Sequence, residues 1–415
     1  MPVQLTPDLF ADALRGAQEV YAPGAAGHSL LFERWLRQSP EATAGCRFFG
    51  VHLPGFNRFD LAALHAQARF AGPFVSADWQ ASWRAGRFEH RPQGYYRCAR
   101  WLTEDARFDL ALLQLAPPDR DGRCSLGVAC DFTPAAWPRA RRVLVHFNPR
   151  MPRTGGPFVP VSAIEAAIEE DMPLLEALAM PEDAALDAVA AQVSALVPDG
   201  ATLQLGLGRL QASVLGALGE RRGLRLHAGM VSDGLLALAA AGALADGDDA
   251  VLAGVALGSA ALYASPALMR VCFAPVTHTH DPRVLASLPR LHAINSALSV
   301  DLFGQVNGER LGQRQASGAG GLPDFLQAAV RARDGRGIIA LPARTGRGEP
   351  RIVPVLPPGP VSLARGEVDT VVTEFGAVRL RDLDVDSRAR ALTAIAHPDD
   401  REALARAWHA LRRDL

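Results

Sequence analysis

The sequence contains no lysine, since all 43 of its basic residues are arginine. A chain without lysine cannot form a lysine Schiff base, which excludes chemistry that depends on pyridoxal phosphate. The arginines are balanced by 44 acidic residues, so the formal net charge is −1. A chain this close to neutrality has no bulk attraction to nucleic acid or to an anionic membrane, and we expect neither as a partner.

Cysteine is scarce, and no targeting or membrane-spanning segment is recognisable. The alanine- and leucine-rich run at 235–244 is too short to span a bilayer. The N-terminus lacks a charged segment followed by an apolar one, so we expect no signal peptide. The cysteines are odd in number and have no metal-ligand spacing, which is typical of reduced, mostly buried thiols in a cytoplasm. They are Cys46, Cys98, Cys124, Cys130 and Cys272.

Length and the order of elements limit the fold. The 415 residues, of which 49% are hydrophobic and 21% charged, favour a soluble protein of two domains. Strand-like segments alternate with helix-like ones through both halves, which predicts an α/β fold with two open, mostly parallel-sheet domains. A helix predicted at 183–196 lies near the expected boundary, so we divide the chain into residues 1–190 and 191–415.

The stretch 201–244 organises the second half. Its apolar start at 201–205 predicts a buried strand, and a Gly-Leu-Gly turn at 206–208 leads into a helix predicted at 212–218. Unpaired N–H groups at such a helix start can face an anion, and glycine lets a ligand approach the backbone. By itself the pattern is weak, because most glycine turns in α/β proteins only connect elements.

A second strand, predicted at 224–228, runs into the sequence His-Ala-Gly-Met at 227–230. Ser232 and Asp233 follow it and are residue types that cap helix N-termini. They predict a helix over 235–244.

The particular residues of these motifs are more informative than the order of strand, turn and helix. Residues 203–208, followed by His-x-x-Met-x-Ser-Asp-Gly at 227–234, resemble the acetyl-CoA hydrolase/transferase family. Its best-known members are 4-hydroxybutyrate and butyrate–acetate CoA-transferases. The segment 294–307 is nearly identical to the corresponding family motif and is the strongest match. Further matches extend the resemblance over nearly the whole chain, at 116–127, 148–155, 317–325, 373–377 and 395–398.

The resemblance implies domains of the CoA-transferase type, with the site in the cleft between them. It implies coenzyme A or an acyl-CoA as substrate, a carboxylate acceptor, no covalently bound cofactor and a homodimer. In relatives the glycine loop at 317–321 lines the thioester site, and its glycines let backbone N–H groups converge on an oxyanion. The candidate CoA contacts are Gly206, Leu207, Gly208, Arg209, Leu210, Ala297, Gly318, Gly320 and Gly321.

The chain departs from the family's pattern at Gly229. Members usually carry a glutamate there, whose carboxylate attacks the thioester and goes through a mixed anhydride to a glutamyl-CoA thioester. Glycine has no side chain for this step, so we expect the route to be closed unless another carboxylate reaches the thioester. Asp233 and Glu374 are the candidates for that role by motif. Asn295, if buried, must satisfy its amide and is either a structural bridge or a ligand donor.

Three hypotheses about function follow. The chain is an acyl-CoA-processing enzyme that passes the acyl group directly to water or another nucleophile, or it is a CoA-transferase with a displaced carboxylate. The alternative is a catalytically degenerate acyl-CoA-binding or partner protein. Turnover separates the last hypothesis from the first two, and transfer of CoA to an added carboxylate separates those two from each other.

His278 and His280 invite a hypothesis of metal binding. Residues two apart share a strand face and would need a further ligand there, and no such residue is recognisable. We therefore expect no metal site.

Overall fold

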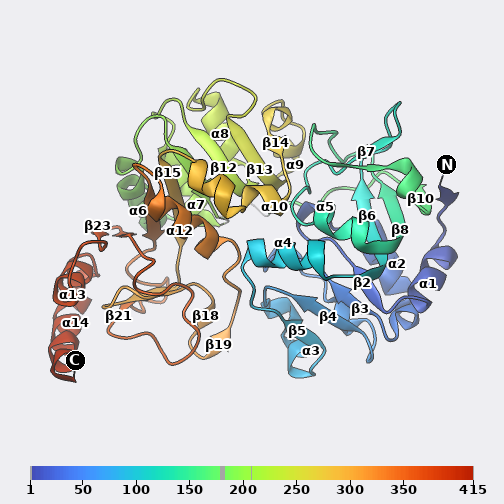
Figure 1. The fold of residues 1–415 in the computed structure, drawn as a ribbon. Coiled ribbons are helices and arrows are strands. Elements are labelled where there is room, and N and C mark those ends of the chain that lie inside the picture. The colour runs from blue at the N-terminus through green and yellow to red at the C-terminus, as the bar shows by residue number, and fades with distance from the viewer. Residues whose placement is uncertain (1, 178–182, 207, 415) are drawn as a thin grey trace.

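The computed structural model describes residues 2–177, 183–206 and 208–414. It has two eight-stranded sheets that lie side by side, with the N-terminus and the C-terminus at opposite ends of the molecule (Figure 1). Helices pack on both sheets, and almost all strand pairs within the sheets are parallel. The prediction of an α/β fold with two open, mostly parallel sheets is confirmed.

The first sheet is formed by the N-terminal half and has the strand order β1-β10-β8-β6-β2-β3-β4-β5. Its central strand β6 is almost entirely buried, as expected for an apolar strand that is covered on both faces. The strands are β1 (Val3–Gln4), β2 (Glu19–Tyr21), β3 (Arg47–Phe49), β4 (Arg69–Gly72), β5 (Phe88–His90), β6 (Phe108–Leu115), β8 (Ala140–Phe147) and β10 (Ala166–Glu169). The helices of this half are α1 (Pro7–Arg15), α2 (Leu30–Gln38), α3 (Gln80–Arg84), α4 (Tyr95–Glu104) and α5 (Thr133–Ala136).

The second sheet has the order β14-β13-β12-β11-β15-β20-β22-β23 and ends in an antiparallel pair, β22 with β23. Its strands are β11 (Thr202–Leu205), β12 (Arg225–Val231), β13 (Val251–Ala256), β14 (Cys272–Phe273), β15 (Leu291–Ser296), β20 (Arg336–Ala340), β22 (Thr370–Thr373) and β23 (Gly376–Arg379). The helices of this half are α6 (Ala184–Ala195), α7 (Arg209–Ala217), α8 (Gly234–Ala240), α9 (Ala260–Tyr263), α10 (Val276–Thr279), α11 (Pro282–Ser287), α12 (Leu322–Arg331), α13 (Val385–Ala394) and α14 (Pro398–Leu411).

Three small sheets complete the fold. The first has the order β17-β16-β21. Its strands β16 and β17 come between β15 and β20 in the sequence, and β21 comes after β20. The other two are antiparallel pairs, β7 with β9 and β18 with β19. Their strands are β7 (Arg123–Ser125), β9 (Phe158–Pro160), β16 (Ser299–Asp301), β17 (Val306–Asn307), β18 (Arg310–Leu311), β19 (Arg314–Gln315) and β21 (Ile352–Val353).

The two halves are joined by backbone hydrogen bonds and by a shared core. The Cys130 N–H donates to the Gly254 carbonyl at 2.9 Å, and the Ala256 N–H donates to the Val128 carbonyl at 2.9 Å. A single cluster of buried apolar side chains includes residues of both sheets. Helix α10 also packs against α4, at the centre of Figure 1. A site between the halves is therefore built on a fixed framework.

The predicted elements of the organising stretch are largely present, with two corrections. Helix α8 ends at Ala240 and not at 244, because Gly242 adopts a positive φ of 63° and the chain turns back. The Leu224 N–H then donates to the Ala243 carbonyl at 2.9 Å, beside β12. Asp233 stands at the start of α8, but its side chain makes no capping hydrogen bond.

The expected division between residues 190 and 191 falls inside α6. That helix packs against α7, β20, β22 and β23, all of the second half. The division itself stays a prediction.

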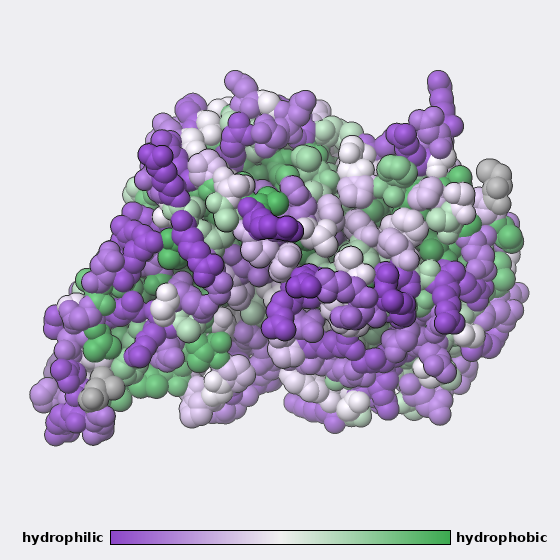
Figure 2. Space-filling view, in the orientation of Figure 1, coloured by the Kyte–Doolittle hydropathy of each residue, from purple (hydrophilic) through white to green (hydrophobic). Residues whose placement is uncertain are grey.

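Four of the five cysteines are buried, Cys272 is exposed, and all five are free thiols. No helix in the described part of the chain is both long and apolar enough to cross a bilayer. Hydrophilic residues dominate the face shown in Figure 2, and hydrophobic residues gather there only in small groups.

Candidate active site

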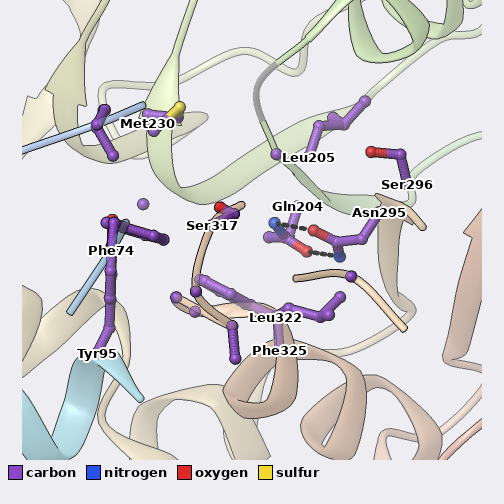
Figure 3. A pocket seen from close by; sticks show the side chains of 18 of the residues that line it. Phe74, Tyr95, Gln204, Leu205, Met230, Asn295, Ser296, Ser317, Leu322 and Phe325 are labelled. Atoms are coloured by element: carbon purple, nitrogen blue, oxygen red, sulfur yellow. Dashed lines mark hydrogen bonds between the residues drawn. The ribbon is translucent and has the colours of Figure 1, made fainter. Parts of the chain in front are cut away.

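A cavity of about 270 Å³ lies between the two halves of the molecule. Its walls come from the C-terminal ends of β11, β12 and β15, the start of α4 and the loop before α12, and Figure 3 shows part of it from close by. Ligands of open α/β sheets bind outside the carboxyl ends of the strands, which is this position. The lining residues are Leu53, Pro54, Phe74, Tyr95, Gln204, Leu205, Gly206, Gln211, Gly229, Met230, His280, Asn295, Ser296, Gly308, Ser317, Gly318, Ala319, Gly320, Gly321, Leu322 and Phe325.

The floor of the cavity carries a pair of amides on neighbouring strands (Figure 3). The Asn295 Nδ2 donates to Gln204 Oε1 at 2.8 Å, and the Gln204 Nε2 donates to Asn295 Oδ1 at 3.4 Å. Both side chains are buried. Asn295 thus satisfies its amide through Gln204, as a bridge between β11 and β15, and one of its two Nδ2 hydrogens is left for a ligand.

Gly229 lies near the end of β12 and lines the cavity. Its φ is not in the left-handed region, so backbone conformation alone does not require glycine there. The space in front of it is occupied by His280: a Cβ at 229 would lie 3.0 Å from His280 Cε1 and 3.4 Å from Nε2. The imidazole therefore lies in tight contact with the place where a side chain at 229 would begin.

The glycine loop at 317–321 forms the opposite wall. Its fit depends on glycine, because a Cβ at 318 would lie 2.2 Å from the Pro73 carbonyl oxygen, and Gly320 has a positive φ of 56°. The Tyr95 N–H donates to the Gly320 carbonyl at 3.3 Å and fixes the loop to α4. The N–H groups of residues 318–321 donate to no acceptor among the described residues, so they are free to bind a ligand oxygen.

A second cavity, of about 210 Å³, adjoins the first and shares Gln211, Ser296 and Gly308 with it. Its lining includes four of the residues that we predicted from the sequence as CoA contacts: Gly208, Arg209, Leu210 and Ala297. Gly206, Gly318, Gly320 and Gly321 line the first cavity. Leu207 lies outside the described residues. Every described candidate contact thus borders one of two adjoining spaces.

Arg351 brings a cation to the second cavity. Its Nη1 donates to the Ala297 carbonyl at 3.0 Å. Its Nε is buried and has no hydrogen-bond partner in the described structure. Burial lowers the pKa of this guanidinium, which nevertheless stays charged at any working pH.

The two candidate carboxylates lie away from the first cavity. Asp233 accepts hydrogen bonds from the Ser259 Oγ at 2.7 Å and from the Ser259 N–H at 3.1 Å. Glu374 accepts the Ala343 N–H at 2.8 Å through Oε2. Neither residue is among those that line either cavity, and each is already engaged in holding a neighbouring segment.

The sequence missed the first half's share of the site and the role of His280. Phe74 and Tyr95 close one side of the cavity, and the His280 ring packs on Tyr95 and Phe325 at centroid distances of 5.2 and 4.6 Å. Phe74 and Tyr95 belong to no motif recognised in the sequence, and packing of the first half against the second, including α4 against α10, brings them to the site. His278 and His280 are not joined by a third metal ligand. Among the described residues, no three His, Cys, Asp or Glu side chains lie close enough together to hold a metal ion.

Known proteins resemble this chain over most of its length. Residues 54–178 match the acetyl-CoA hydrolase/transferase N-terminal domain, and residues 258–408 match the C-terminal domain of the same name. The 4-hydroxybutyrate coenzyme A transferase of Clostridium kluyveri is 36% identical over 345 residues, which are 80% of this chain and 80% of that protein.

Solved structures agree. RipA from Yersinia pestis superposes with a TM-score of 0.89 at 28% identity, over 99% of this chain and 98% of its own. A 4-hydroxybutyrate CoA-transferase from Porphyromonas gingivalis superposes with a TM-score of 0.79, also at 28% identity, over 100% of this chain and 98% of its own. These relatives support the expectation of an enzyme, either a CoA-transferase or an acyl-CoA hydrolase. The chain belongs to the acetyl-CoA hydrolase/transferase family.

Proposed function

We propose that this protein hydrolyses acyl-CoA thioesters by direct attack of water, without a covalent enzyme intermediate. The observation that carries the proposal is the lining of the first cavity. Among its described residues it has no acidic side chain to act as nucleophile, and it includes Gly229, where the resemblance to the family predicts a glutamate. It also has no arginine to bind an acceptor carboxylate.

Coenzyme A would enter through the second cavity, with its thioester at the junction of the two spaces. Arg351 and the turn before α7 border that route and offer a cation and backbone N–H groups to the pantetheine amides or the phosphates. The shared lining residues Gln211, Ser296 and Gly308 mark the junction.

The acyl group would lie in the first cavity and would be short and uncharged. Leu205, Met230, Phe325 and the rings of Phe74 and Tyr95 give this space a mainly apolar wall. A carboxylate buried there without a cation would lose its hydration with no compensating partner. We therefore expect butyryl-CoA to be preferred to succinyl-CoA.

In the reaction, the water oxygen bonds to the thioester carbonyl carbon, and the carbonyl oxygen becomes an oxyanion. The N–H groups of the glycine loop, which have no acceptor among the described residues and border the cavity, would stabilise that charge. The C–S bond then breaks, the acid is released, and the CoA thiolate takes up a proton. The balance is acyl-CoA plus water to carboxylic acid plus CoA.

A chromatographic time course tests the proposal. Purified protein is incubated with acetyl-, butyryl-, 4-hydroxybutyryl- or succinyl-CoA, with and without acetate as a second carboxylate. We expect free CoA without an acceptor, and fastest from butyryl-CoA. New acyl-CoA that forms only when acetate is present would instead show transfer with a relocated carboxylate. No change in any mixture would favour the binding protein.

Intact-protein mass spectrometry adds an independent test. Family members that use a glutamate carry CoA on that residue during turnover, whereas direct hydrolysis leaves the protein unmodified. We expect no mass increase after incubation with butyryl-CoA, and an added mass of CoA would contradict the proposal.

A further inference from the structure

The ring of His280 packs against Gly229, the residue without a side chain at the site. His280 Nε2 lies between Gly229 and Gly321: a Cβ at 229 would lie 3.4 Å from Nε2, and a Cβ at 321 would lie 2.4 Å from it. Both glycines line the first cavity, and so does His280. Glycine at these two positions is what makes room for the ring.

One nitrogen of this ring is held and the other is free. Nδ1 is 2.8 Å from Thr279 Oγ1, which fixes the ring plane. Nε2 has no hydrogen-bond partner anywhere in the described residues, although the ring is only 1% exposed. When Nδ1–H donates to the threonine hydroxyl, Nε2 presents a lone pair to the cavity.

The surroundings keep this imidazole neutral. Burial, with a smaller contribution from the neighbouring His227, lowers its pKa to about 3. The rings of Tyr95 and Phe325 pack against it, and no carboxylate pairs with it. At working pH the ring is therefore unprotonated. It is a weak base in the resting protein, and the negative oxyanion that forms beside it raises its pKa during the reaction.

We propose that His280 is the general base of this protein and replaces the family's carboxylate at 229 with an imidazole that activates water. The inference rests on the proposed hydrolytic function. It changes the kind of catalysis from a covalent carboxylate to proton transfer, because the nucleophile now comes from solvent.

His280 Nε2 takes a proton from water while the water oxygen bonds to the thioester carbon. The oxyanion forms next to the N–H groups at 318–321, and Gly321 itself packs against the ring. When the C–S bond breaks, the imidazolium returns its proton to the CoA sulfur, and the neutral base is restored.

The test compares His280→Asn and His280→Ala with a matched control, His278→Asn. His278 belongs to α10, close to His280, and does not line the cavity. Butyryl-CoA hydrolysis is measured for each variant, with circular dichroism to verify folding. We expect kcat to fall about 100-fold or more in both His280 variants, while KM changes by less than about threefold. The control should keep the wild-type rate.

Added imidazole provides a readout that a structural role would not give. The space left in His280→Ala should admit free imidazole and recover part of the lost rate in proportion to its concentration. The His278→Asn control should not respond. A folded His280→Asn variant that retains its rate, or the absence of rescue in a folded His280→Ala variant, would overturn the inference.

Gly229→Ala keeps the histidine and decides the matter if neither His280 variant folds. Its methyl group would lie 3.0 Å from His280 Cε1 and must shift the ring by a few tenths of an ångström. We expect kcat to fall about tenfold, and an unchanged kcat would overturn the inference. If the wild type hydrolyses and these variants retain its rate, the proposed function stands and only the base is wrong. If the wild type releases no CoA, both proposals fail.

Discussion

At the scale of single residues, Gly229 and His280 form a complementary pair. The ring occupies the space that a side chain at 229 would need, with only 3.0 Å between its Cε1 and a Cβ at that position. Contacts this close force one group to move. A carboxylate side chain at 229 and the imidazole at 280 therefore compete for space, and we expect carboxylate chemistry at 229 to be favoured when both positions change.

This competition for space predicts the behaviour of Gly229→Glu. The single variant should lose hydrolysis by about 100-fold, because the new side chain displaces the ring of His280. The double variant Gly229→Glu with His280→Asn should gain CoA transfer from butyryl-CoA to acetate and should carry CoA covalently. Chromatography and intact-protein mass spectrometry measure the two effects. Full transfer activity in the single variant would show that the two groups do not compete.

Arg351 gives a second prediction at this scale. Because its buried Nε has no partner among the described residues and borders the second cavity, we expect it to bind the CoA moiety. Arg351→Met should raise KM for butyryl-CoA about tenfold, or about 1.4 kcal/mol, with little change in kcat. Arg347→Met, an exposed arginine nearby in sequence, is the matched control. Equal KM values for both variants would exclude the proposed route of CoA.

At the scale of elements, Asp233 connects α8 to the segment that begins α9. Its carboxylate accepts two hydrogen bonds from Ser259. Asp233→Ala should lower the free energy of unfolding by about 2 kcal/mol, because two part-buried donors lose their acceptor. The kcat of the folded variant should remain near that of the wild type. Urea unfolding and initial rates measure these quantities, and a large loss of kcat at unchanged stability would make Asp233 a catalytic carboxylate.

Elements also show what could be predicted from the sequence. The strands at β11 and β12 and the glycine loop follow local patterns, so their positions and their common site could be predicted. The helix over 235–244 was too long, because a glycine with positive φ ends it early. His280 could not be assigned a role, because its neighbours Tyr95 and Phe325 come from α4 and α12, which are distant in sequence. Hydrophobic periodicity carries no information about such contacts.

At the scale of the whole molecule, buried histidines make stability depend on pH. Burial lowers the pKa of His52 and His280 to about 3 and that of His227 to about 4. The unfolded chain takes up these protons near pH 6.5, while the folded chain does not. The stabilising effect is therefore complete above pH 6.5 and declines as the pH falls from there towards the folded-state pKa.

His280→Asn isolates one of these contributions. Between pH 7 and pH 5 the wild type should lose about 2 kcal/mol of unfolding free energy more than the variant, since one proton corresponds to about 1.4 kcal/mol per pH unit below 6.5. Asp131 and Asp324, whose pKa burial raises to about 6, act in the opposite direction and cancel in the comparison. Urea titrations of both proteins at the two pH values give the difference. Parallel losses would mean that His280 is protonated in the folded protein.

The central claim is that water, and not an enzyme carboxylate, attacks the thioester. A single turnover of butyryl-CoA with the protein in excess, in water enriched in ¹⁸O, tests it most directly. Direct attack predicts butyrate that carries one ¹⁸O from the first turnover and a protein that gains none. Unlabelled butyrate, together with ¹⁸O in a protein carboxylate, would contradict the account and show that a covalent carboxylate route survives.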